Sequence, residues 1–128
     1  MTNHGMVHLP TNHSVEDILG KLQTILKTKG VPVFALVDHS GEAAKVGMEM
    51  RPTKLLIFGN PKAGTPVMLS APSAALDLPL KILLAQEPDG TTQVSWNDAT
   101  WLQQRHDFSP ELIANLAAVE ALARKAAE

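Results

Sequence analysis

The sequence predicts an α+β domain with the order strand, helix, four strands, helix. Two observations carry this prediction. A segment with helical periodicity is followed by four short apolar or alternating segments, and a second helical segment closes the chain. Runs of strands separated from helices are typical of an antiparallel or mixed sheet with helices packed on one face. The 128 residues are expected to form a single domain over 1–128, with short extra helices in the connections.

The first strand is expected at Gly5–Leu9 and the first helix directly after it. Ser14 has the capping-box spacing to Asp17, which predicts a helix start. Apolar residues then recur at helical period, at Val15, Ile18, Leu19, Leu22, Ile25 and Leu26. Gly30 fits the left-handed position that follows a helix, so the helix is expected to end at Lys29.

Four strands are predicted in the middle of the chain. They are Val33–Val37, Thr53–Phe58, Leu80–Gln86 and Thr91–Trp96. A helical turn over Ser40–Val46 is expected between the first two, and Pro88–Gly90 predicts a tight turn between the last two. Leu55–Phe58 is an unbroken apolar run, which predicts a central strand covered on both faces.

The remaining segments predict helices. Thr65 is expected to cap a short helix with Pro66 at its first position, and Pro72 must end or kink that helix. A second short helix is expected from Asn97 or Asp98 to about Arg105. The last helix starts at Ser109–Glu111, with the apolar stripe Leu112, Ile113, Leu116, Val119 and Leu122.

Composition and charge argue against several functional classes. A net charge of −2 offers no broad footprint for nucleic acid or an anionic membrane. The chain has no cysteine, and its five histidines are scattered without a zinc-binding spacing, so no metal or cofactor is expected. No signal-peptide pattern and no membrane-spanning apolar run is visible, and a cytoplasmic location is therefore expected.

The loop Asn60–Pro66, which follows the predicted central strand, is the candidate binding site. Together with the preceding Gly59, Gly64 gives the two-glycine spacing of a phosphate loop, but Thr65 and Pro66 stand where lysine and a hydroxyl residue are needed, so a nucleotide triphosphatase is not expected. The residues expected to hold a small polar or anionic ligand are Asn60, Lys62, Gly64, Thr65 and, from the neighbouring segment, Asp77. The alternative is a rigid turn or part of a subunit contact.

A second hypothesis is a small acid–base enzyme. His39 lies beside Asp38 at the predicted end of a strand, which makes this pair a candidate for proton transfer. Asp77 is a further candidate for the same role. The alternative for His39 is an ordinary loop histidine.

The run Glu49–Met68, followed by Asp77–Lys81 and Trp96–Asp98, resembles the domain-of-unknown-function 302 family. The first helix and Val33–His39 also fit it. The resemblance implies a compact α+β domain with a topology like that of the TATA-binding protein, found as a homodimer. It implies no particular reaction, and likeness of topology is no evidence for DNA binding. A homodimeric binding module, an acid–base enzyme and a structural or regulatory interaction protein are thus the three hypotheses.

Overall fold

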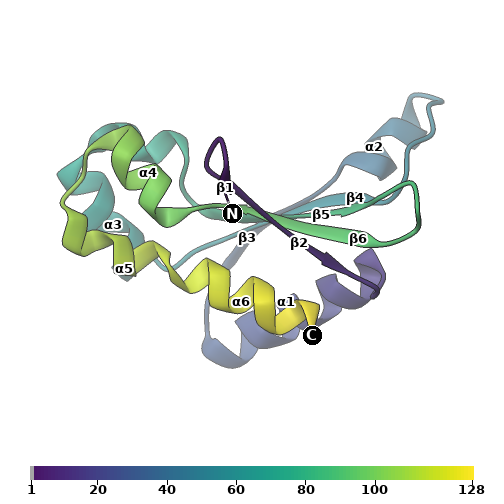
Figure 1. Cartoon of the computed structure of the whole chain (residues 1–128), viewed down its shortest axis with the longest axis horizontal. Coiled ribbons are helices and arrows are strands. Elements are labelled where there is room, and N and C mark those ends of the chain that lie inside the picture. Colours follow the sequence, from purple (N-terminus) through teal and green to yellow (C-terminus); the bar gives the residue numbers. More distant parts are fainter. Residues whose placement is uncertain (1) are drawn as a thin grey trace.

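The computed structural model describes residues 2–128, which form one antiparallel sheet with helices packed against it (Figure 1). The strands are β1 (Thr2–Asn3), β2 (Met6–Thr11), β3 (Val33–Asp38), β4 (Thr53–Phe58), β5 (Leu80–Gln86) and β6 (Thr92–Asn97). They lie in the order β1-β2-β6-β5-β4-β3, and every neighbouring pair is antiparallel. The predicted α+β class is confirmed.

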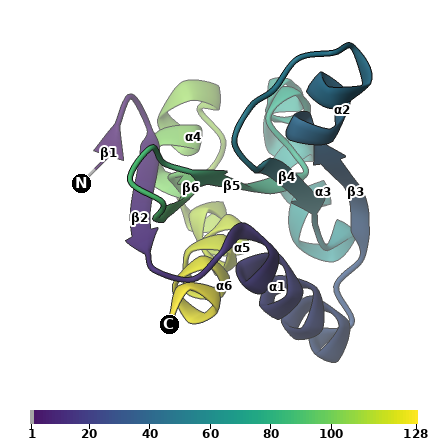
Figure 2. The same cartoon turned by 90° about the vertical axis from the view of Figure 1, so that its right-hand side faces the viewer.

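The helices form two groups. They are α1 (Val15–Lys29), α2 (His39–Lys45), α3 (Pro61–Ser70), α4 (Ala99–His106), α5 (Ile113–Leu116) and α6 (Ala118–Ala127), with two 3₁₀ turns, η1 (Pro72–Leu76) and η2 (Pro110–Leu112). Helices α1 and α6 lie side by side on one face of the sheet (Figure 2). Helices α3, α4 and α5 gather at one end, and α2 projects from the other end on an arm (Figure 1).

Helix α1 forms as its sequence predicts. The Ser14 hydroxyl oxygen accepts a hydrogen bond from the backbone N–H of Asp17 at 3.0 Å. Gly30 ends the helix with φ of 68°, a conformation that favours glycine. The apolar stripe of α1 is buried against the sheet, with Ile18 and Leu22 fully enclosed.

The protein has two apolar clusters. The larger one lies between the sheet and the pair α1 and α6, and includes Leu56, Ile82 and Leu84, all fully buried. The second lies at the end of the molecule among α3, η1, α4 and α5, and is centred on Phe108 and Val67. Burying one such large apolar side chain contributes about 1.5–3 kcal/mol. These two clusters therefore fix where α3 lies relative to the sheet.

The expectation that the strand Thr53–Phe58 is central and covered on both faces is wrong. Strand β4 lies next to the edge strand β3. Leu56 and Phe58 are buried, whereas Leu55 and Ile57 on the opposite face are only half-buried. The physical reason is that α1 and α6 both pack on the first face (Figure 2), so that Leu55 and Ile57 on the second face lie outside the main apolar cluster.

Two predicted helices differ from the structure. Helix α3 begins at Pro61 rather than at Pro66, because Asn60 caps it and Pro61 occupies its first position. The last helix is divided into η2, α5 and α6 with a break at Ala117. The break separates Leu116, which packs in the end cluster, from Val119, which packs under the sheet.

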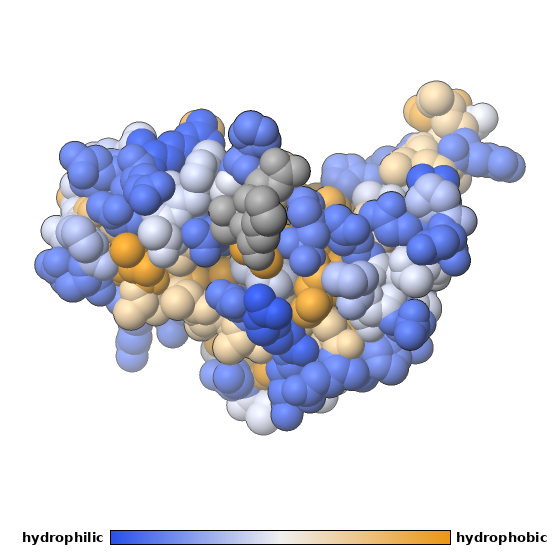
Figure 3. Space-filling view, in the orientation of Figure 1, coloured by the Kyte–Doolittle hydropathy of each residue, from blue (hydrophilic) through white to orange (hydrophobic). Residues whose placement is uncertain are grey.

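The arm around α2 carries exposed apolar side chains. Val46, Met48 and Met50 are all exposed in the segment that joins α2 to β4. In Figure 3 the projecting arm at the upper right shows hydrophobic colours that contrast with the largely hydrophilic surface below it. The edge strand β3 also carries two exposed apolar side chains, Phe34 and Leu36.

Candidate functional site

A cleft of about 370 Å³ opens beside the start of α3. Its floor and walls come from the end of α1, the ends of β4 and β5, and the helices α3, α5 and α6. The walls are mainly apolar side chains, among them Leu26, Phe34, Phe58, Met68, Leu78 and Leu122. A concave apolar site of this size with a few polar groups is the usual form of a small-molecule site.

Gly59 lets the chain pass closely between β3 and β5 on its way into the cleft. A Cβ atom at this position would lie 3.4 Å from Cβ of Pro79 and 3.5 Å from the Phe34 ring. The backbone N–H of Gly59 also donates to the carbonyl oxygen of Pro32 at 3.2 Å. The end of β4 is therefore held against both neighbouring strands.

Asn60 turns the chain from β4 into α3. Its side-chain oxygen accepts a hydrogen bond from the backbone N–H of Lys62 at 3.0 Å. Such a cap satisfies one of the N–H groups left free at a helix start. Pro66 lies inside the helix and cannot donate to the carbonyl of Lys62, the usual i−4 partner. The predicted loop is thus the first two turns of a helix.

Four polar side chains line the otherwise apolar cleft. They are Lys29, Asn60, Thr65 and Asn115. Lys29 is the last residue of α1, and among the described residues that line the cleft there is no carboxylate to neutralise it. These polar side chains consequently favour a hydrogen-bonding or negatively charged group on the ligand.

The predicted ligand-binding residues divide into two groups. Asn60, Gly64 and Thr65 line the cleft. Lys62 is exposed and lies outside the described lining. Asp77 also lies outside it, although the next two residues, Leu78 and Pro79, are part of the lining.

Asp77 belongs to a separate polar cluster at the end of the molecule. Its carboxylate oxygen Oδ2 lies 2.6 Å from Nε2 of His106 and 3.3 Å from Nη1 of Arg105. The ammonium group of Lys81 donates to the backbone carbonyl of Asp77 at 2.7 Å. Burial lowers the pKa of Lys81, and the nearby charge of Asp77 partly offsets that effect.

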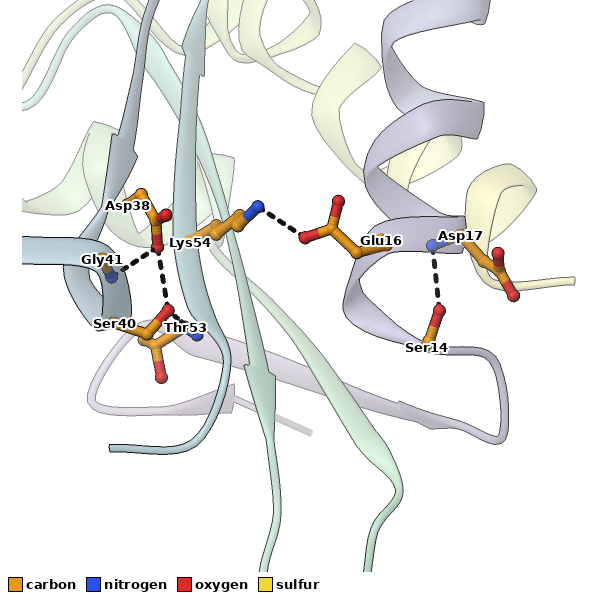
Figure 4. Close-up of polar contacts among 8 residues, drawn as sticks. All are labelled: Ser14, Glu16, Asp17, Asp38, Ser40, Gly41, Thr53 and Lys54. Atoms are coloured by element: carbon orange, nitrogen blue, oxygen red, sulfur yellow. Dashed lines mark hydrogen bonds and ion pairs between the residues drawn. The ribbon is translucent and has the colours of Figure 1, made fainter. Parts of the chain in front are cut away.

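Asp38 lies at the end of β3, beside Ser40 and Gly41 (Figure 4), and His39 follows it as the first residue of α2. The Asp38 carboxylate accepts hydrogen bonds from the backbone N–H of Gly41 at 2.9 Å and from the Ser40 hydroxyl at 2.8 Å. These bonds hold the pKa of Asp38 below its usual value. The carboxylate therefore caps α2, while His39 is exposed as the first residue of that helix. Neither lines the cleft, and their acid–base use stays a prediction.

Sequence reasoning missed most of the cleft. Lys29, Phe34 and Asn115 come from three distant segments that only packing brings together. One available signal was the pair Asn60-Pro61, since asparagine favours the cap and proline the first position of a helix. Among the described residues, no three acidic or histidine side chains are placed to hold a metal ion. No helix of residues 2–128 is both long and apolar enough to cross a membrane.

Comparison with known proteins identifies relatives of two kinds. The sequence model of the family described as "Domain of unknown function DUF302" matches residues 7–127. A solved structure described as an uncharacterized conserved DUF302 protein from Bacillus stearothermophilus has a TM-score of 0.77 at 20% identity, covering 96% of this chain and 95% of that one. At this identity the likeness shows the fold alone.

The curated relatives are proteins named as fluoride-specific ion channels. FluC 1 of Brucella suis biovar 1 is 37% identical over 104 residues, which are 81% of this chain and 41% of that protein. FluC 1 of Brucella abortus biovar 1 is also 37% identical over 104 residues and is covered to 38%. The chain thus spans about two-fifths of the length of these relatives.

Proposed function

The chain belongs to the DUF302 family, and on that premise we propose that it is a binding module for a small molecule with an apolar body and one polar or anionic end. The observation that carries the proposal is the cleft of about 370 Å³ with apolar walls and four polar side chains. Sites of roughly 300–1,000 Å³ with this lining are typical of small-molecule binding. A cytoplasmic location remains part of the proposal.

The walls decide which ligand fits. Transfer of apolar surface from water into the cleft is favourable by about 25 cal/mol per Å². A bare anion would instead lose its hydration against Leu26, Phe58 and Leu122 without a matching partner. The polar or anionic end of the ligand is therefore expected to lie against the four polar side chains, of which Lys29 supplies the positive charge.

A thermal-shift experiment tests this proposal with octanoate, octanol and inorganic phosphate as probes. We expect octanoate to raise Tm most, octanol less, and phosphate not at all, because binding to the folded state alone stabilises it. Gly64→Leu should abolish the shift by filling the cleft, since only the Leu78 side chain lies within 4 Å of a Cβ at Gly64.

Lys62→Ala is the matched control, because Lys62 is exposed on the same helix but outside the described lining. This variant should keep the octanoate shift. An equal octanoate-induced rise in Tm in wild type and Gly64→Leu would show that octanoate binds outside the cleft. A shift with phosphate alone would support a bare anion site instead.

We also propose that two copies pair through the exposed edge of β3. This strand is the last of the sheet, so the backbone groups on its outer side have no neighbouring strand. An identical edge related by a two-fold axis is a natural antiparallel partner for such a strand. The exposed apolar side chains of Val33, Phe34 and Leu36 would be covered by this contact, and a net charge of −2 per chain opposes it only weakly.

Sedimentation velocity distinguishes this dimer from a monomer. Leu36→Asp should yield a monomer, because a carboxylate on the edge would be buried in the contact. Leu69→Asp is the control, since Leu69 is also an exposed leucine, with 79% of its surface accessible against 40% for Leu36, but lies on α3. A wild-type monomer, or a dimer that survives Leu36→Asp, would contradict the proposed contact.

A regulatory role linked to fluoride is the second candidate function. The similarity over 104 residues to proteins named as fluoride-specific channels favours it. The match covers only about two-fifths of those proteins, so we do not propose that this chain conducts ions. Sodium fluoride should then raise Tm relative to sodium chloride at equal ionic strength. Equal Tm values in the two salts would remove this candidate.

A further inference from the structure

Ser73, His106 and Asp77 form a continuous hydrogen-bonded chain between η1 and the end of α4. The Ser73 hydroxyl lies 2.8 Å from Nδ1 of the His106 ring, and Nε2 of the same ring lies 2.6 Å from Oδ2 of Asp77. The His106 side chain is only 4% exposed, whereas Ser73 is exposed. The hydroxyl therefore faces solvent with a buried imidazole behind it.

In the neutral imidazole, one position of the ring proton fits both contacts. An ionised Asp77 can only accept a hydrogen bond, so in this form Nε2 carries the proton and Nδ1 presents its lone pair to the Ser73 hydroxyl. A nucleophile, a base and an orienting carboxylate therefore stand in the order that activates serine, with the two ring nitrogens exchanged relative to the Ser-His-Asp triad, in which the serine faces Nε2.

Neighbouring groups hold the carboxylate in position. Nη1 of Arg105 lies 3.3 Å from Oδ2 of Asp77, and the guanidinium lies over the Trp101 ring at 5.4 Å. On the other side, the Lys81 ammonium donates to the backbone carbonyl of Asp77. Asp77 is thus fixed both through its side chain and through its backbone, as an orienting residue requires.

We propose that Ser73 is a nucleophile toward carboxylic esters, with His106 as its general base and Asp77 as the positioning residue. Oγ of Ser73 forms a bond to the acyl carbon while its proton passes to Nδ1 of His106. The bond between the acyl carbon and the leaving oxygen breaks, and that oxygen takes the proton from Nδ1. Water then hydrolyses the Ser73 ester, giving its proton to the same nitrogen, and Oγ regains a proton as the acid leaves.

The alternative is that the chain of bonds only ties α4 to η1. A tie of this kind would stabilise the fold but would not raise the reactivity of Ser73. Labelling by a fluorophosphonate, followed by mass spectrometry, separates the two. The reaction joins Oγ to phosphorus and expels fluoride, and the tryptic peptide 63–81 contains both Ser70 and Ser73. We expect the label on Ser73.

Variants complete the test. Ser73→Ala should abolish labelling, and His106→Gln should slow it at least about tenfold, because general-base help is worth two or more powers of ten. Ser70→Ala is the control, since Ser70 is exposed three residues away and its hydroxyl oxygen accepts from the backbone N–H of Ser109. It should label at the wild-type rate. An unlabelled Ser73, or labelling unchanged in folded His106→Gln, would overturn the proposal.

A second measurement tests the activation of position 73 even if His106→Gln fails to fold. In Ser73→Cys the thiol lies beside the imidazole, which should increase its thiolate fraction and its rate of alkylation by iodoacetamide at neutral pH. We expect this rate to exceed that of Ser70→Cys at least about tenfold. Equal rates for the two thiols would show that His106 does not activate position 73.

Discussion

Asn115 joins two of the helices that enclose the cleft, because its side-chain amide donates a hydrogen bond to the backbone carbonyl of Ala63 at 3.0 Å. Asn115 lies on α5 and Ala63 on α3. Both residues line the cleft, and 52 positions separate them in the sequence. The shape of the candidate site thus depends on a contact between distant segments.

Asn115→Leu tests this contact. Leucine has a similar shape but no donor, so the variant should lose about 0.5–1.5 kcal/mol of unfolding free energy, measured by urea denaturation. Asn12→Leu, at an exposed position, should change stability by less than about 0.5 kcal/mol. Equal losses at the two positions would show that the contact to Ala63 contributes nothing.

Gly5→Ala should be strongly destabilising. Gly5 has φ of +83°, and a Cβ there would overlap the Trp101 ring. We expect a cost of about 2–5 kcal/mol, from left-handed strain together with overpacking. Gly47→Ala shares the positive φ, at +77°, but meets nothing within 4 Å, and should cost only about 1–2 kcal/mol. Chemical denaturation of both variants checks the difference, and equal costs would contradict it.

Gly64→Ala should stabilise the protein. Its Cβ would lie 3.9 Å from Cδ1 of Leu78, an ordinary contact, and alanine is favoured over glycine inside a helix by up to about 1 kcal/mol. Gly59→Ala should gain less, because Gly59 lies outside the helix and has no helix preference to satisfy, while its Cβ would meet Pro79 and Phe34 at ordinary contact distances of 3.4 and 3.5 Å. A lower Tm for Gly64→Ala than for wild type would mean that this part of α3 is not helical in solution.

The Asp38 carboxyl should titrate below its usual pKa of 3.8, because Gly41 and Ser40 donate to its charged form. A carboxyl whose pKa is lower in the folded state stabilises that state above pH 3.8. This contribution is lost as the pH falls through the folded pKa. Carboxyl ¹³C NMR should show the lowered pKa in wild type and a rise toward 3.8 in Ser40→Ala. An Asp38 pKa at or above 3.8 in wild type would contradict the cap.

Local signals in the sequence were sufficient for most of the fold. Ser14 and Gly30 marked both ends of α1, and short apolar segments located the strands. Such signals act within a few residues and need no knowledge of packing. The predicted start of α3 at Pro66 is wrong, because Asn60 caps the helix and Pro61, five residues earlier, is its first residue. A proline inside a helix is disfavoured locally and is tolerated here by tertiary packing of Val67.

The candidate sites were less accessible to sequence reasoning. The sequence predicts Asn60, Gly64 and Thr65 as binding residues because they belong to the segment that follows the strand β4. Phe34 and Asn115 could not be found, since only tertiary packing brings these distant segments to the cleft. For the same reason Asp77 was predicted without His106, its partner 29 residues away. Their contact depends on how α4 packs against η1.

An NMR titration of ¹⁵N-labelled protein with octanoate tests the binding site most directly. We expect chemical-shift changes at the amides of Gly59 and Gly64 and at the side-chain amide of Asn115, with Gly41 and Gly90 unchanged. Octanoate should produce none of these changes in Gly64→Leu. Changes confined to the arm around α2, or no changes at saturating octanoate, would contradict the account.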